Sequence, residues 1–337
     1  MSQTRGLATM CIRPFILALI SLFVLTTAHA QCLGENLIAA LSKDEKAALY
    51  TSTHAEPFAT GNFWLATRGE QTVYIAGTFH LDDPRHDAVM SVLAPHLAQS
   101  KTLMTEAGPE EEAALQAHLA SDPSAMMDPA GSGLATALPP QEWEALTAAL
   151  LRRGIPSSIA QTLRPWFVSM MLSIPPCALQ MAATGQGLDK RLIAAAQAQS
   201  IPVKALEPFD TILTLFDGMT AEEQTTMIRN NLQVEPQAED FLATTADSYF
   251  DGEGRLIWEF SRHIALGLPG ATPAQTEADF AKAEAALMTD RNRAWIPRIL
   301  GALQDGPVFA AFGALHLSGE AGVLALLDAE GFTLEPL

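Results

Sequence analysis

Two short phrases of the chain share one pattern, in which an apolar run ends at a glycine and a histidine follows three residues later. They are "VYIAGTFHLDD" (73–83) and "VFAAFGALHLS" (308–318). A short apolar run that stops at glycine is typical of a buried β-strand, and glycine there permits a sharp turn or a close backbone approach. The pattern therefore predicts two similar strands, with Gly77 and Gly313 at their ends and His80 and His316 just beyond.

The residues around the first phrase predict a strand–helix–strand unit. Upstream, two β-rich segments flank the turn "TRGEQ". Downstream, "PRHDAVMSVLAPHLAQS" (84–100) has apolar positions at helical spacing, and "KTLMTEAG" gives a short strand that ends at Glu106. Such crossovers connect parallel strands.

Two further units follow the same plan. "GLDKRLIAAAQAQSIPVKALEPFD" is a helix, a turn and a strand ending at Glu207, and "GEAGVLALLDAEGFTLEPL" closes the C-terminus with a helix and a strand. In parallel sheets, ligands bind beyond the carboxyl ends of the strands. We therefore expect His80, Glu106, Glu207 and His316 to contribute to one pocket.

The rest of the chain reads as helical. The fold class expected is α/β, with a central, mostly parallel sheet, a strand-end site and a largely helical insertion at about 109–172, all in one domain over 31–337. The other helical segments predicted by apolar spacing are 109–119, 140–153, 157–172, 220–232, 236–250, 253–266 and 273–304.

The first thirty residues have the pattern of a secretory signal peptide. Arg5 and Arg13 precede an apolar stretch, and Ala28-His29-Ala30 is a small-x-small cleavage signal. We predict cleavage after Ala30 and a periplasmic or secreted protein without stable membrane insertion. A retained membrane anchor is the alternative.

Charge excludes some partners. Without the leader's two arginines the chain has 18 basic and 38 acidic residues, a net charge of −20. Such a chain repels nucleic acid and anionic membrane surfaces, so neither is an expected partner.

Export also determines the expected oxidation state of the cysteines. Only Cys32 and Cys177 remain after cleavage, and in an oxidising compartment they are expected to form a disulfide. Two buried free thiols are the alternative.

Two imidazoles with one or two carboxylates form a donor set suited to Zn, Mn, Fe or Co. Such an ion acidifies bound water, and an arginine nearby could stabilise an oxyanion. However, roughly half a Gly-x-x-His match is expected by chance at this composition, so structural histidines compete with a shared site.

Other residues give weaker signals. His86, His96 and His118 are expected at the surface, and Trp166 and Trp295 in the core. The sequence has no G-x-S-x-G elbow, H-E-x-x-H, P-loop or dinucleotide fingerprint.

Taken together and in order, several phrases resemble the TraB/GumN family, which is related to the Tiki metalloproteases and more distantly to erythromycin-esterase-like and ChaN-like proteins. The phrases are "CLGENLIAAL", "YIAGTFHL", "TEAG", "RPWFVSMML", "GLDKRLIAAAQAQSIPVKALEPFD", "DRNRAWIPRI" and "FAAFGALHLSGEAGVLALLDAEGF".

The resemblance implies site residues. The two Gly-x-x-His motifs correspond to Gly77 with His80 and Gly313 with His316; the family glutamate corresponds to Glu106, and its arginine to Arg291. Glu207 matches a "Leu-Glu" position and ranks below Glu106. The helix after it lacks the glutamine common in the family, which weakens any role for that helix.

The resemblance implies a hydrolase of the peptidase type that uses a divalent metal ion (Mn, Co, Zn or Fe) on a peptide or small-molecule substrate. Two alternatives stay open: a protein that binds haem, iron or a small ligand on the same fold, and a non-catalytic accessory of envelope or polysaccharide assembly.

Overall fold

The computed structural model describes residues 32–128, 130–131 and 133–337. The predicted leader and its cleavage site lie outside the described residues. Residues Cys32–Leu337 form one compact unit. Its centre is a six-stranded sheet in the order β4-β3-β5-β2-β1-β6, with strands β1 (Phe63–Arg68), β2 (Gln71–Thr78), β3 (Thr102–Thr105), β4 (Val203–Ala205), β5 (Val308–Gly313) and β6 (Thr333–Pro336).

The four strands that carry the predicted site are parallel. β5 pairs with β2 on one side and with β3 on the other, and β3 pairs with β4. The segment between β2 and β3 contains α3 (His86–Gln99), as the apolar spacing predicts. β1 is antiparallel to both β2 and β6, so the sheet is mixed but mostly parallel.

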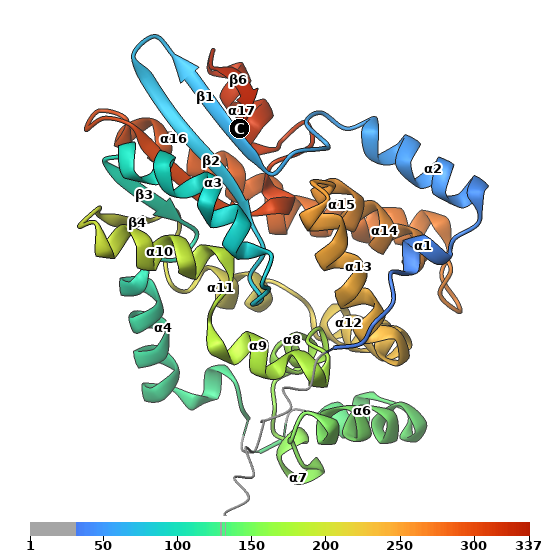
Figure 1. Ribbon diagram of the computed structural model, residues 1–337. Coiled ribbons are helices and arrows are strands. Elements are labelled where there is room, and N and C mark those ends of the chain that lie inside the picture. Colours follow the sequence, from blue (N-terminus) through green and yellow to red (C-terminus); the bar gives the residue numbers. More distant parts are fainter. Residues whose placement is uncertain (1–31, 129, 132) are drawn as a thin grey trace, which may run out of the picture. The chain divides into compact units, whose positions relative to one another are not determined.

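Helices cover both faces of the sheet (Figure 1). On one face α3 and α10 (Leu188–Ala198) bury leucines against Phe309 and Ala311 of β5. On the other, α16 (Asp290–Ala302) and α17 (Val323–Ala329) pack against the alternate β5 residues, including Phe312. A central strand buried on both faces reads as a continuous apolar run, which is why "VFAAF" lacks alternation.

The segment after β3 is helical, and part of it forms a separate hydrophobic cluster with Ile228 that includes Leu146, Leu150 and Val168. Its elements are α4 (Pro109–Ser121), the 3₁₀ turn η1 (Pro123–Ala125), α5 (Leu134–Ala137), α6 (Pro140–Arg152), α7 (Ser157–Ala160) and α8 (Pro165–Leu172). The single helix expected over 157–172 is therefore two helices, because Pro165 takes the first position of a new helix.

Besides the 3₁₀ turn η5 (Ala314–His316) directly after β5, the remaining helices lie at the N-terminus, between β3 and β4, and between β4 and β5. They are α1 (Leu37–Ala40), α2 (Lys43–His54), η2 (Pro176–Ala178), α9 (Leu179–Thr184), α11 (Thr211–Asp217), α12 (Ala221–Val234), η3 (Glu235–Gln237), α13 (Ala238–Phe250), α14 (Gly254–Leu266), α15 (Pro273–Glu284) and a π-helical turn η4 (Ala285–Thr289) that joins α15 to α16. Ser42 and Glu45 form a capping box that starts α2, which separates it from α1.

In the described chain no single helix is long and apolar enough to cross a membrane. One bent pair, Pro165–Leu172 with Pro176–Ala198, satisfies length and composition together, with a bend of 88°.

The predicted disulfide is present. Cys32 and Cys177 are bonded, with their Cα atoms 5.3 Å apart, and the bond joins the start of the described chain to η2.

Candidate functional site

The ends of the four parallel strands bring the predicted residues together in the order of the sheet. Glu207 follows β4, Glu106 follows β3, His316 follows β5 and His80 follows β2. The register places Thr78 beside Gly313, so both Gly-x-x-His motifs leave the sheet at the same edge.

Glycine is required at the two motif positions for different steric reasons. A Cβ on Gly77 would lie 2.6 Å from Leu317 Cδ1 and 3.0 Å from Ala314 Cα, so this glycine lets the second motif pack against the first. A Cβ on Gly313 would lie 3.3 Å from Glu106 Oε1 and 3.5 Å from His80 Nε2. The second glycine therefore keeps space open among the site side chains.

Arg291 is the centre of the polar network. It extends from α16, with its side chain only 12% exposed, and pairs with Glu207 through Nε (2.9 Å) and Nη2 (2.7 Å). Nη2 also donates to Glu106 Oε2 at 2.6 Å, while Nη1 donates to the Leu287 carbonyl and lies 3.3 Å from His316 Nε2. These five interactions match the five N–H donors of a guanidinium, so none is left over.

Glu106 is held as a carboxylate. Its Oε1 accepts from the Gly313 backbone N–H at 2.7 Å, and its Oε2 accepts from Arg291. Burial alone would raise the pKa of Glu106, but the imidazoles of His316 and His80 and the charge of Arg291 outweigh it and lower the pKa to about 2.

The two histidines lie in opposite surroundings. His316 is 6% exposed, and burial lowers its pKa to about 4. Its Nδ1 lies 2.6 Å from Asn292 Oδ1, which fixes Nδ1 as the donor and leaves Nε2 as the acceptor. His80 lies at the mouth with an exposed side chain and Nδ1 3.2 Å from Asp189 Oδ1.

Two positioning residues were missed in the sequence. Asp189, in the first turn of α10, lies beside His80. Desolvation by the surrounding protein opposes the charged form of His80, but Asp189 and the charge of Glu106 outweigh it and raise the pKa of His80 to about 9. Asn292 is 1% exposed and also donates to the Ala321 carbonyl at 2.9 Å. Neither follows a strand, so the strand-end pattern gave no signal for them.

A cavity of about 180 Å³ opens at this site. Its lining residues are Thr78, His80, Thr105, Glu106, Ala107, Glu112, Asp189, Lys190, Ala311 and Phe312. Thr78 is 3% exposed, and its hydroxyl has no hydrogen-bond partner among the described residues. A polar group of that kind on the wall of a cavity is placed to meet a ligand.

The structure tests the burial that the sequence predicts for Trp166, Trp295 and His86. Trp166 and Trp295 are buried as predicted, at 6% and 1% exposed, and Trp295 also donates to Glu207 at 3.3 Å. The surface position predicted for His86 is wrong. It is fully buried, because its ring packs among Phe79, Tyr249 and Phe250.

The model of the TraB/PrgY/gumN family matches residues 62–336, which includes every strand-end residue described above. Among curated proteins, none matches the chain significantly.

Proposed function

Because the chain belongs to the TraB/PrgY/gumN family, we propose that it is a metal-dependent hydrolase that cuts a peptide or a similar amide or ester bond in the periplasm or outside the cell. The observation that carries the proposal is the convergence of His80, Glu106, His316 and Arg291 at one edge of the parallel sheet. Two imidazoles, a carboxylate and a guanidinium beside a cavity can bind an ion and stabilise a developing negative charge.

The donor set fits a divalent ion by its chemistry. His80 Nε2 and Glu106 Oε1 lie within 3.5 Å of the position that a Gly313 Cβ would fill, and His316 Cδ2 lies 3.7 Å from it. Imidazole and carboxylate ligands suit Zn, Mn, Fe and Co. As the side chains stand, no group of three or more His, Cys, Asp or Glu among the described residues is arranged to hold an ion.

The position of Arg291 explains why the side chains are not arranged around an ion. It interacts with Glu106 Oε2 and lies within hydrogen-bond distance of His316 Nε2, the atom through which His316 would bind an ion. Binding through Nε2 therefore requires Arg291 Nη1 to leave this position. Since all five donors of Arg291 are in use, this release frees one N–H beside the site for a substrate oxygen.

The roles of the residues follow from these contacts. His80, His316 and Glu106 would hold the ion, which supplies a Lewis acid and a water of lowered pKa. Asp189 and Asn292 orient the two imidazoles through their Nδ1 atoms, as carboxylate and amide partners of ligating histidines commonly do. Glu207 holds Arg291, whose freed N–H stabilises the oxyanion that develops on the substrate carbonyl.

The test is hydrolysis of a defined peptide pool by the full chain recovered from the exported fraction, with new amino termini counted by mass spectrometry. Arg291→Lys keeps the charge but loses the planar fork, so we expect a loss of roughly 10²-fold or more in turnover. Arg229→Lys is the matched control, since Arg229 pairs with Glu142 and takes no part in the strand-end network. Equal turnover by both variants, or turnover that survives chelation, would contradict the proposal.

A further inference from the structure

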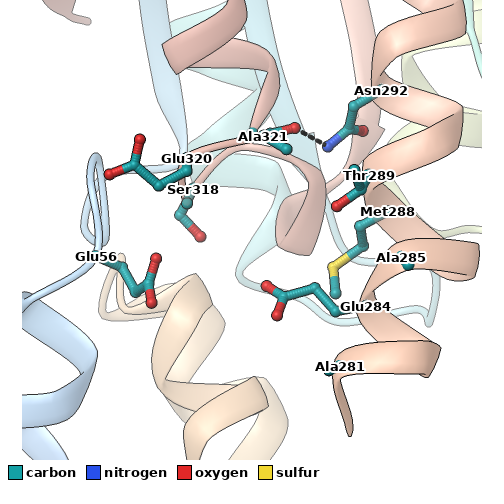
Figure 2. Close-up of a pocket in the computed structure, with 12 residues that line it drawn as sticks. Glu56, Ala281, Glu284, Ala285, Met288, Thr289, Asn292, Ser318, Glu320 and Ala321 are labelled. Carbon is teal, nitrogen blue, oxygen red and sulfur yellow. Dashed lines mark hydrogen bonds between the residues drawn. The ribbon is translucent and has the colours of Figure 1, made fainter. Parts of the chain in front are cut away.

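A second cavity, of about 320 Å³, lies beside α16 and is separate from the strand-end residues. It is bounded by α15, the π-helical turn η4, the first turn of α16 and the loop after His316 (Figure 2). Its lining residues are Glu56, Ala281, Glu284, Ala285, Met288, Thr289, Asn292, Ser318, Gly319, Glu320, Ala321 and Gly322. Of the residues already assigned, only Asn292 is shared with the histidine site.

The cavity has an excess of negative charge. Figure 2 shows the carboxylates of Glu56 and Glu284 directed toward the same space. Arg255 pairs with Glu284 at 2.5 Å and lies 3.7 Å from Glu56, but it is also bound to Glu259 at 2.8 Å. One guanidinium therefore faces three carboxylates.

The second arginine nearby does not restore the balance. Arg262 pairs with Glu259 at 2.9 Å and with Glu277 at 2.6 Å. The connected network thus contains two arginines and the four carboxylates of Glu56, Glu259, Glu277 and Glu284. Two negative charges are left uncompensated within it, and the carboxylates that reach the cavity are those of Glu56 and Glu284.

Ser318 gives an independent sign of a ligand. It is only 7% exposed, and its hydroxyl has no hydrogen-bond partner among the described residues. In Figure 2 its side chain is directed into the cavity, between Glu56 and Glu284. Buried hydroxyls nearly always have a partner, so the missing partner is expected to come from the occupant of the cavity.

We propose that this cavity binds a small primary ammonium compound. An ammonium group has three N–H donors and no acceptor, which matches two carboxylates and one hydroxyl. Met288, Ala285 and Ala281 give the opposite wall an apolar surface for a short aliphatic stem. An occupant would also touch Asn292, the residue that holds His316, although binding itself does not depend on the proposed hydrolase activity.

The test is a titration of the full chain, labelled with ¹³C-methyl methionine, with n-butylammonium. The Met288 methyl signal, assigned by comparison with Met288→Leu, reports on this cavity. We expect it to shift and saturate with n-butylammonium, and to stay unchanged with n-butanol, which has the same stem without the charge. Tetramethylammonium, a cation without N–H donors, should bind at least about tenfold more weakly, because hydrogen bonds to charged groups contribute roughly this factor.

Variants locate the binding groups. Ser318→Ala and Glu56→Gln should each weaken n-butylammonium binding about tenfold. Glu320→Gln is the matched control, because the Glu320 carboxylate points away from the cavity in Figure 2 and its removal should leave the affinity unchanged. The proposal is overturned if n-butanol shifts Met288 equally, if tetramethylammonium binds as well, or if Ser318→Ala and Glu56→Gln bind like Glu320→Gln.

Discussion

His80 and His316 are both histidines, but their surroundings drive their protonation in opposite directions. Although the surrounding protein partly desolvates His80, Asp189 and Glu106 raise its pKa to about 9, whereas burial lowers the pKa of His316 to about 4. In the metal-free protein near neutral pH, His80 is therefore protonated and His316 is neutral, so an ion that binds through His80 must displace its proton. Pairs of titratable groups whose pKa values are driven apart are typical of sites that handle charge or protons.

Asp189 is expected to maintain this difference. Asp189→Asn removes a negative charge and a carboxylate acceptor beside His80 Nδ1, both of which favour the imidazolium. The pKa of His80, followed by NMR titration of its ring protons in metal-free protein, should fall from about 9 toward the ordinary histidine value. Glu112→Gln is the control, because Glu112 lines the same cavity but pairs with Lys190. An unchanged His80 pKa in Asp189→Asn would contradict this role.

His86 makes a pH-dependent contribution to stability. Burial lowers its pKa, so the unfolded chain takes up a proton at a higher pH than the folded chain does. Folding stability should therefore fall as pH decreases below about 6.5, by at most about 1.4 kcal/mol per pH unit from this residue.

His86→Gln tests this contribution, since glutamine can still donate to the Leu81 carbonyl that lies 3.0 Å from His86 Nε2. Urea unfolding between pH 7 and pH 5 should show a shallower loss of stability in the variant than in the native protein. Parallel pH curves for the two proteins would contradict the prediction.

At the scale of elements, the start of α10 is fitted against the end of β2. The Leu188 N–H donates to the Phe79 carbonyl at 3.0 Å, which brings Asp189 to His80. A Cβ on Gly187 would lie 2.2 Å from the His80 carbonyl oxygen. A glycine is therefore required where the helix meets the strand end.

Gly187→Ala is expected to destabilise the protein by roughly 1–3 kcal/mol, because neither backbone can move freely to remove the clash. Gly301→Ala is the control: Gly301 lies within α16 with open space around its missing Cβ, so alanine there should stabilise by about 0.5–1 kcal/mol. Urea unfolding measures both effects. A native-like midpoint for Gly187→Ala would show that the close approach is not constrained.

The sequence predicts some elements better than others for physical reasons. Apolar runs identify the strands, because β2, β3 and β5 are buried on nearly every residue. The helix break at Pro165 depends on proline geometry inside a long periodic stretch, and spacing alone hides it. His86 was misplaced because aromatic neighbours from α13 bury it, and no local pattern encodes that contact.

The site residues that the sequence predicts mostly follow strands. The site residues that it misses are identified only by tertiary contacts. Glu106, Glu207 and the two motif histidines follow strands, so topology alone brings them together. Asp189 lies 109 residues from His80, in a helix whose sequence has no strand-end signature. Only the packing of that helix against the residues that follow β2 reveals its contact with the imidazole.

For the whole molecule, the Cys32–Cys177 bond closes a long loop. The two residues are 145 positions apart, so the bond restricts the unfolded chain strongly. The double variant Cys32→Ser/Cys177→Ser should lose roughly 2–4 kcal/mol of unfolding free energy, measured with urea. Reductant should destabilise the native protein similarly and leave the variant unaffected. A native protein with the same midpoint in reductant would contradict a stabilising role.

The central claim is that His80 and His316 bind one divalent ion together, and Co²⁺ titration of chelator-stripped protein, followed by visible absorption and calorimetry, tests it most directly. We predict one tight site per chain in the native protein, lost in His80→Ala and in His316→Ala but kept in His54→Ala, which removes a histidine that pairs with Glu253 outside the site. Native-like stoichiometry and affinity in both His80→Ala and His316→Ala would contradict the claim.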